Sequence, residues 1–187
     1  LNLEAIGVKL NEKKSIEINS KFKTSVDGIY AIGDVVPGPM LAHKAEEEGV
    51  ACVELISGQK PHINYEMIPA IVYTNPEVAS VGKTETELKA KKIDYKIGKF
   101  PFMANGRALT TSSPEGFVKI LADSKSDAIL GAHIIGHDAG QLIAEIVTTM
   151  EFGGSSEDIA RICHAHPTTS EAVKEAAMSI EGRAIHI

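Results

Sequence analysis

A histidine and a glutamate near the C-terminus have the types and the spacing of an acid–base pair. His166 is followed by Pro167, and Glu171 comes five residues after the histidine, at the start of a predicted helix. Imidazole gains or loses a proton near neutral pH, and a nearby carboxylate can orient it. Because the residue before a proline favours extended backbone, we expect His166 to project from a loop. The pair predicts proton-transfer chemistry, although the sequence shows no matching nucleophile.

Glu171 also has a purely structural interpretation. Thr168 and Glu171 match the capping-box pattern S/T-x-x-E, in which the glutamate accepts a hydrogen bond from the amide of the first residue. On spacing alone this structural role is favoured, because such boxes open many ordinary helices.

Three residues of the same segment, Cys163, His164 and His166, are metal-ligand types, so a zinc or copper site is an alternative. Their spacing is tighter than that of familiar zinc sites, and no second cluster supplies a fourth ligand, although other histidines could fold near. We therefore predict no metal site. Cys163 could be a nucleophile, but it follows Ile162 in an apolar context, which favours a buried packing thiol.

A second candidate site follows a short apolar run in the first third of the chain. Residues 29–32 predict a buried strand, and Gly33 and Asp34 come at its carboxyl end, where open α/β sheets bind ligands. The alternative is a turn held by an Asx hydrogen bond. By default His43 is a partly exposed histidine at a helix N-terminus.

The composition is that of an ordinary globular protein of 187 residues, 43% hydrophobic and 24% charged. A net charge of −6 with no basic run argues against a nucleic-acid partner. No apolar stretch approaches the roughly 20 residues of a membrane span, and no signal peptide opens the chain. Two distant cysteines, Cys52 and Cys163, indicate a reducing compartment such as the cytoplasm. Since no methionine begins the sequence, we expect a piece of a longer protein.

The elements that must position these residues divide the chain into two predicted parts, residues 1–57 and 61–187. Turn-forming residues between Ser57 and Pro61 separate them. In the first part, apolar residues at helical spacing predict a helix over residues 40–56.

The second part predicts an α+β domain, with helices on one face of an antiparallel sheet. Two strands joined by a short polar turn should form an antiparallel hairpin. The predicted strands cover residues 68–74, 95–102, 116–122 and 129–135, and the predicted helices cover residues 84–92, 142–150, 155–158 onward and 168–180.

The order of these pieces resembles a known family, the pyridine nucleotide-disulfide oxidoreductases. The run from Thr24 to Asp34 resembles the family's second flavin-binding motif: T, four residues, two apolar residues, A, an apolar residue, G and D. Further runs resemble the branch of the family that oxidises dihydrolipoyl thiols, and together they cover the whole chain. These runs are Gly38–Glu46, Phe100–Asn105, Gly131–His133, Glu157–Arg161 and Cys163–Thr168.

The resemblance implies that residues 1–57 end the FAD-binding and central region and that residues 61–187 form the interface domain of a homodimer. It implies that Asp34 accepts a hydrogen bond from the ribitol of FAD. Four residues would line the flavin, namely Met40, Leu41, Ala42 and His43. We expect no FAD on this chain alone, because the family's phosphate-binding GxGxxG loops are not in it.

The resemblance also implies roles for the C-terminal pair. His166 would take the proton of a dihydrolipoyl thiol in the partner subunit's active site, and Glu171 would stabilise the imidazolium. The thiolate would attack a redox disulfide, and electrons would pass through FAD to NAD+. The family's CxxxxC pair is not in this sequence, so the chain alone is expected to be inactive.

The implied partner is the lipoyl-bearing acyltransferase of a 2-oxo acid dehydrogenase complex, in the cytoplasm or, in a eukaryote, the mitochondrial matrix. Two alternatives remain at this point. One is a sister flavoprotein that reduces glutathione disulfide or mercuric ion, and the other is a non-catalytic dimerisation module.

Overall fold

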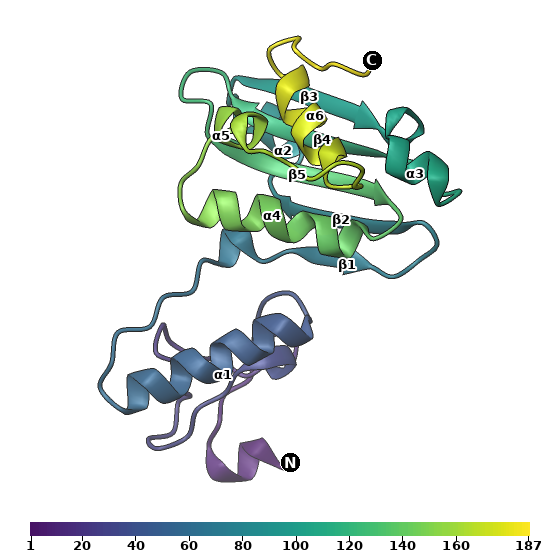
Figure 1. The fold of residues 1–187 in the computed structure, drawn as a ribbon. Helices are drawn as coiled ribbons and strands as arrows, with labels where there is room; N and C mark the ends of the chain where they lie inside the picture. Colours follow the sequence, from purple (N-terminus) through teal and green to yellow (C-terminus); the bar gives the residue numbers. More distant parts are fainter. The chain divides into compact units, whose positions relative to one another are not determined.

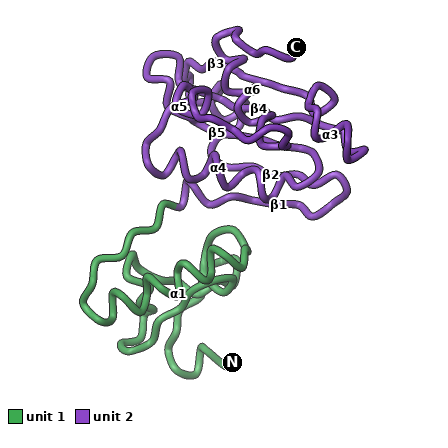
Figure 2. Tube along the Cα trace, in the orientation of Figure 1, with its two compact units in different colours: residues 1–64 green, residues 65–187 purple.

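The computed structural model describes all 187 residues. The chain forms two compact units, residues 1–64 and residues 65–187 (Figure 2). None of its helices has the length and the hydropathy that a membrane crossing requires.

The second unit is built on a five-stranded sheet in which every neighbouring pair is antiparallel. In the order of the sheet, β1-β2-β5-β4-β3, its strands are β1 (Ala70–Val72), β2 (Glu77–Gly82), β5 (Ile129–Gly136), β4 (Phe117–Asp123) and β3 (Tyr95–Pro101). The predicted hairpin is present as β4 and β5, with Val118 opposite Ile134. The α+β fold with an antiparallel sheet is therefore confirmed.

Two helices, α4 (Ala139–Glu151) and α6 (Glu171–Ser179), cover the same face of this sheet (Figure 1). Helix α4 packs on β2 and β5, and α6 packs on β3 and β4. Gly98 lets α6 come close, because a Cβ there would lie 2.0 Å from the carbonyl oxygen of Ala176. Helix α5 (Ser156–Arg161) packs beside α6.

The short helix α2 (Glu85–Ala90) lies on the opposite side of the sheet. Its Glu85 pairs with Lys119, whose side chain alternates along β4 with the buried Val118 and Ile120. The predicted capping box at its start is present, since the side chains of Thr84 and Glu87 each bond the other's backbone amide.

One strand and one α-helix of this unit were not predicted. Strand β2 lies between Pro76 and the turn after Gly82, and its length comes from pairing with the central strand β5. Helix α3 (Gly106–Thr110) is a single turn capped by the side chain of Asn105. Strand β2 depends on a partner that is distant in the sequence, and α3 is too short to show a helical pattern, so local patterns reveal neither.

The first unit contains one long helix, α1 (Ala42–Ile56), where a helix was predicted. The predicted strand at residues 29–32 was wrong. Tyr30 makes only an isolated bridge to Lys23, and the 3₁₀ turn η2 (Gly33–Val35) follows. A strand needs neighbours along its length, and this unit offers none to that segment.

The buried face of α1 is not its apolar stripe. Val50 and Val53 are 58% and 64% exposed, whereas Lys44 and Glu48 are among its buried side chains. This face of the helix therefore exposes apolar side chains, which is typical of a surface that packs against another part of a protein.

Candidate active site

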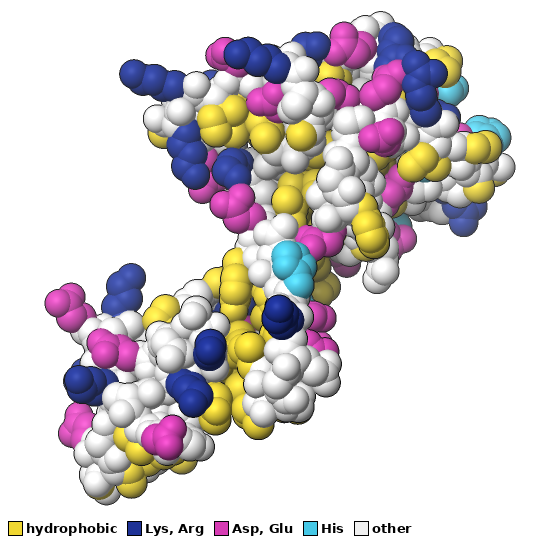
Figure 3. All heavy atoms as spheres, turned by 90° about the vertical axis from the view of Figure 1, so that its left-hand side faces the viewer, with side chains coloured by type: hydrophobic (Ala, Val, Ile, Leu, Met, Phe, Trp, Pro, Cys, Tyr) yellow, Lys and Arg dark blue, Asp and Glu magenta, His cyan; other side chains and the backbone are white.

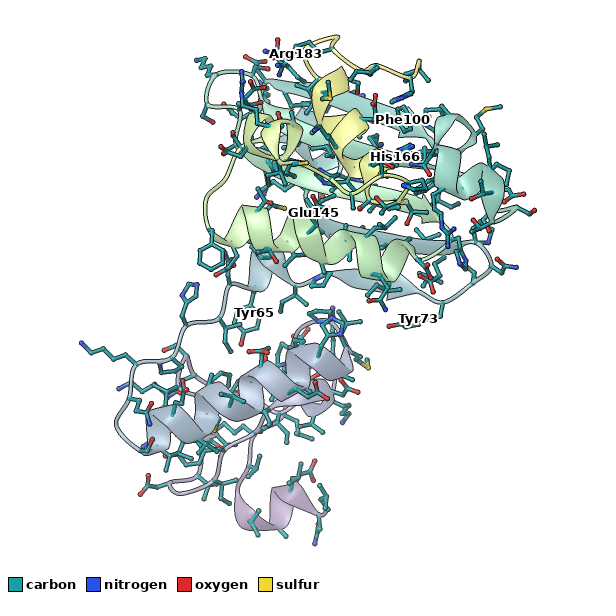
Figure 4. The ribbon with its side chains drawn as sticks, in the orientation of Figure 1. Tyr65, Tyr73, Phe100, Glu145, His166 and Arg183 are labelled. Carbon is teal, nitrogen blue, oxygen red and sulfur yellow. The ribbon has the colours of Figure 1, made fainter.

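The loop between α5 and α6, residues 162–170, carries His166 on the sheet face that α6 covers (Figure 4). The His166 ring is 75% exposed. Its Nδ1 atom lies 2.9 Å from Oε1 and 3.2 Å from Oε2 of Glu171, the first residue of α6. The structure thus brings together the two residues that the sequence suggested as an acid–base pair.

This contact determines which nitrogen of His166 can act. A carboxylate accepts hydrogen bonds, so Nδ1 carries the hydrogen in the neutral ring and Nε2 keeps its lone pair. In an exposed ring that lone pair can take a proton from a bound molecule. A carboxylate behind the ring then stabilises the imidazolium that forms.

Glu171 also serves the start of the helix. Its Oε2 atom accepts the amide hydrogen of Thr168 at 2.8 Å. The capping box is only half formed, however, because the Thr168 hydroxyl donates to the carbonyl of Ala165 and the helix begins at Glu171 itself. Glu171 therefore makes the structural contact and the contact with His166 together.

The pKa of Glu171 lies below its usual value. Burial raises it, but the hydrogen bonds from Thr168 and His166 and the positive charges of His166 and His186 together outweigh burial. The carboxylate is thereby kept ionised near neutral pH, which is the state that can orient and stabilise the imidazolium.

A second histidine, His164, anchors the loop to α4. Its side chain is only 6% exposed, and its Nε2 atom lies 2.6 Å from Oε1 of Glu145. Its Nδ1 atom lies 3.1 Å from the carbonyl oxygen of Ile162, to which Lys174 also donates. The sequence suggested His164 only as a metal ligand. Glu145 stood out only as a carboxylate beside the apolar stripe of α4, and that pattern did not predict the contact.

The thiol of Cys163 is exposed, so the expectation of a buried packing residue was wrong. Its neighbour Ile162 is 49% exposed, because both residues follow the last turn of α5. The chain places no three histidine, cysteine or acidic side chains where they could share a metal ion. The rings of His164 and His166 instead face separate carboxylates.

A small pocket of about 30 Å³ lies beside the His166–Glu171 pair. The buried Asn105 forms part of it and donates from Nδ2 to the carbonyl of Thr168, which ties the loop to the start of α3. Its other lining residues are Phe100, Ala104, Gly106, Glu175 and His186. The sequence suggested His186 only as a distant histidine that could fold near a metal site, and it did not indicate Glu175.

The second candidate site lies in the first unit, around the turn η2. The amide of Gly33 donates to Oε2 of Glu48 at 2.7 Å, and Nζ of Lys44 donates to the carbonyl of Gly33 at 3.2 Å. Lys44 and Glu48 are 3.0 Å apart and nearly fully buried. This ion pair fixes the turn, and the neighbouring Asp34 side chain is exposed.

The four residues predicted to line a flavin lie at the start of α1. Met40 is 77% exposed, Leu41 and His43 are partly buried, and Ala42 is the first residue of the helix. Gly33 lets η2 approach α1, because a Cβ there would lie 3.0 Å from that of Ala45. The Asp34 carboxylate and the Met40 side chain are thus both accessible to a ligand.

The sequence is similar to known protein families in both of its units. The sequence matches the family described as pyridine nucleotide-disulphide oxidoreductase, dimerisation domain, over residues 68–177, more than half of the chain. Residues 1–49 match the family described as pyridine nucleotide-disulphide oxidoreductase.

Several curated relatives are named dihydrolipoyl dehydrogenase. The chain is 57% identical over all its residues to the mitochondrial dihydrolipoyl dehydrogenase of Pisum sativum and to the dihydrolipoyl dehydrogenase of Trypanosoma brucei brucei. It spans only 37% and 39% of those two proteins. It thus corresponds to well under half of the relatives that it matches.

A solved structure has the same fold. LpdA from Mycobacterium tuberculosis superimposes on 96% of this chain with a TM-score of 0.89 and 26% sequence identity, and the match covers 39% of LpdA.

Proposed function

The chain belongs to the pyridine nucleotide-disulphide oxidoreductase family, and from that membership we propose that it supplies the dimerisation domain and the acid–base pair of a dihydrolipoyl dehydrogenase. Such an enzyme oxidises protein-bound dihydrolipoamide to lipoamide. The observation that carries the proposal is the contact of His166 Nδ1 with Glu171 at 2.9 Å, which leaves Nε2 available to take a proton.

His166 acts on the thiol of the substrate. Its Nε2 atom takes the thiol proton, which leaves a thiolate, a far stronger nucleophile. Glu171 holds the ring in the required tautomer and stabilises the imidazolium. The thiolate attacks a redox disulfide that the full-length enzyme supplies. It forms a mixed disulfide with one sulfur, the original S–S bond breaks, and the other sulfur leaves as a thiolate. His166 then holds the proton until it is released.

The turn at Gly33 and Asp34 and the start of α1 form part of the flavin site in this proposal. Asp34 would accept a hydrogen bond from a ribitol hydroxyl of FAD, and Met40, Leu41, Ala42 and His43 would line the ring. FAD, when bound, supplies the electron transfer that links thiol oxidation to NAD+. Residues 1–57 then belong to the FAD-binding and central region, and residues 61–187 belong to the interface domain.

The enzyme is a homodimer in this proposal, and His166 acts in the site of the partner subunit. The exposure of the His166 ring, 75%, supports this arrangement, because a base that serves another chain must face outward. The substrate is carried by the lipoyl-bearing acyltransferase of a 2-oxo acid dehydrogenase complex. The location is the cytoplasm of a bacterium or the mitochondrial matrix of a eukaryote.

Substrate turnover by the full-length enzyme tests the proposal. Reduction of NAD+ should be rapid with dihydrolipoamide, and glutathione disulfide should not be reduced at a comparable rate by NADH or NADPH. Preferred turnover of glutathione disulfide would replace the proposal with a sister disulfide reductase.

A further inference from the structure

A second imidazole–carboxylate pair lies beside His166 and Glu171. The C-terminal segment returns to α6, and Nδ1 of His186 lies 2.7 Å from Oε1 of Glu175. The amide of Ile185 donates to the other oxygen of Glu175 at 2.8 Å. The Glu175 side chain is only 7% exposed, whereas that of His186 is 60% exposed.

The two pairs share one pocket and one helix. Glu171 and Glu175 are four residues apart on α6, so they lie on the same helix face one turn apart, and two negative charges at this spacing repel each other. Each of them faces a histidine, and all four side chains line the pocket of about 30 Å³.

No lysine or arginine lines this pocket. The remaining lining residues come from β3, η4 (Phe102–Ala104), the cap before α3 and the first residue of α3. None of them is charged: Phe100, Ala104, Asn105 and Gly106. The two nearest cations along α6 and the C-terminal segment have other partners. Lys174 donates to the carbonyl of Ile162, and Arg183 pairs with Glu157.

We propose that His186, held by Glu175, is a positioning residue of the acid–base site. It cancels the charge of the second carboxylate on α6, so that Glu171 alone acts on His166. The inference rests on the proposed function for the identity of the site, but its geometry belongs to the 187-residue chain alone. His186 also contributes to the low pKa of Glu171, although it is the smallest of the causes.

Titration of the Glu171 carboxyl group by ¹³C NMR tests the inference without any turnover. In His186→Gln the uncompensated Glu175 should raise the pKa of Glu171 by about 0.2–0.4, the scale of a partly exposed pair of charges one helical turn apart. His186→Lys, which keeps a positive charge within reach of Glu175, should restore most of the shift. His137→Gln is the matched control, because His137 is an exposed histidine on the turn before α4.

A Glu171 titration in His186→Gln that coincides with that of the His137→Gln control would overturn the inference. So would a failure of His186→Lys to restore the titration, since a role in packing alone needs the ring and not its charge. His186 is mostly exposed, so His186→Gln should leave the fold intact.

The pH–rate profile of the full-length enzyme separates this inference from the proposed function. If His166 is the base, His186→Gln should move the acid limb of thiol oxidation to higher pH by a similar amount, because the remaining carboxylate holds the proton on His166 more tightly. A shifted Glu171 titration with an unmoved acid limb would support the role of His186 and count against His166 as the base.

Discussion

Oε1 of Glu171 lies 2.9 Å from Nδ1 of His166, while Oε2 of the same carboxylate accepts the amide of Thr168. One side chain therefore orients the imidazole and holds the chain at the start of α6. The sequence favoured the structural role on spacing alone, and the structure contains both contacts. The next residue along this face, Glu175, is matched with His186 in the same way.

Replacing Glu171 with glutamine should slow thiol oxidation by the full-length enzyme about 10-fold or more. Glutamine places an amide NH₂, a donor, at one of the two positions where the carboxylate has an acceptor, and it carries no charge to stabilise an imidazolium. Steady-state turnover of dihydrolipoamide measures the effect. Glu115→Gln, at an exposed glutamate outside the pocket, is the control, and equal rates for the two variants would contradict the role of Glu171.

Much of the second unit could be predicted because its signals are local. The stripe of Leu142, Ile143 and Ile146 gave α4, and the polar turn between residues 123 and 128 gave the hairpin of β4 and β5. Local sequence patterns did not predict the structure correctly where a segment depends on partners that are distant in the sequence. Strand β2 exists because β5 pairs with it, and residues 29–32 are not a strand because their unit provides no neighbour along their length.

Replacing His164 with alanine should lower the free energy of unfolding of the second unit by about 2–3 kcal/mol. The change leaves the carboxylate of Glu145 without the imidazole that lies 2.6 Å away, and charged hydrogen bonds of this kind are worth more than neutral ones. Urea denaturation measures it. His137→Ala, at an exposed histidine, should cost far less, and equal losses would show that His164 is not an anchor.

Replacing Lys44 with methionine should destabilise the first unit by about 3 kcal/mol. The buried carboxylate of Glu48 would lose the cation that lies 3.0 Å from it, and removing one partner of a buried ion pair is strongly destabilising. Amide hydrogen exchange at Gly33, whose N–H donates to Glu48, reports the loss locally. Lys13→Met, at an exposed lysine, is the control, and unchanged protection of Gly33 in Lys44→Met would contradict the account.

The candidate site was predictable only in part. His166 and Glu171 are close in sequence, so their spacing predicted their contact. His164 and Glu145 are 19 residues apart, and the chain reverses direction between Glu175 and His186. Neither contact could be predicted from spacing, because each forms only when the chain folds. The buried Lys44–Glu48 pair was missed for another reason, because charged residues are expected on the outer face of a helix.

Acid should destabilise the second unit in two stages. Burial, followed by the charge of Lys119, holds the pKa of His133 below its ordinary 6.5, so the stability that this group contributes is present above pH 6.5 and is lost as pH falls through the lower folded value. The pKa of Glu171 is also below its ordinary 4.5, so the stability that this carboxylate contributes is present above pH 4.5 and is lost as the pH falls through the lower folded value. Melting temperatures measured from pH 8 to pH 3 should fall below pH 6.5 and fall further below pH 4.5. A melting temperature that rises on acidification would contradict both signs.

The sequence predicts no nucleic-acid partner, because the net charge is −6 and no basic run is present. On the face drawn in Figure 3, basic and acidic side chains are interspersed. A neutralising mixture of this kind provides no electrostatic footprint for a phosphate backbone.

The central claim is that His166 takes the proton of the substrate thiol, and rapid mixing of full-length His166→Gln with dihydrolipoamide tests it most directly. Electron transfer to the flavin from dihydrolipoamide should be about 100-fold slower or more, the scale of a lost general base, while electron transfer between NADH and the flavin stays at the rate of the His137→Gln control. If His166→Gln accepts electrons from dihydrolipoamide as fast as the control, His166 is not the base and the account is wrong.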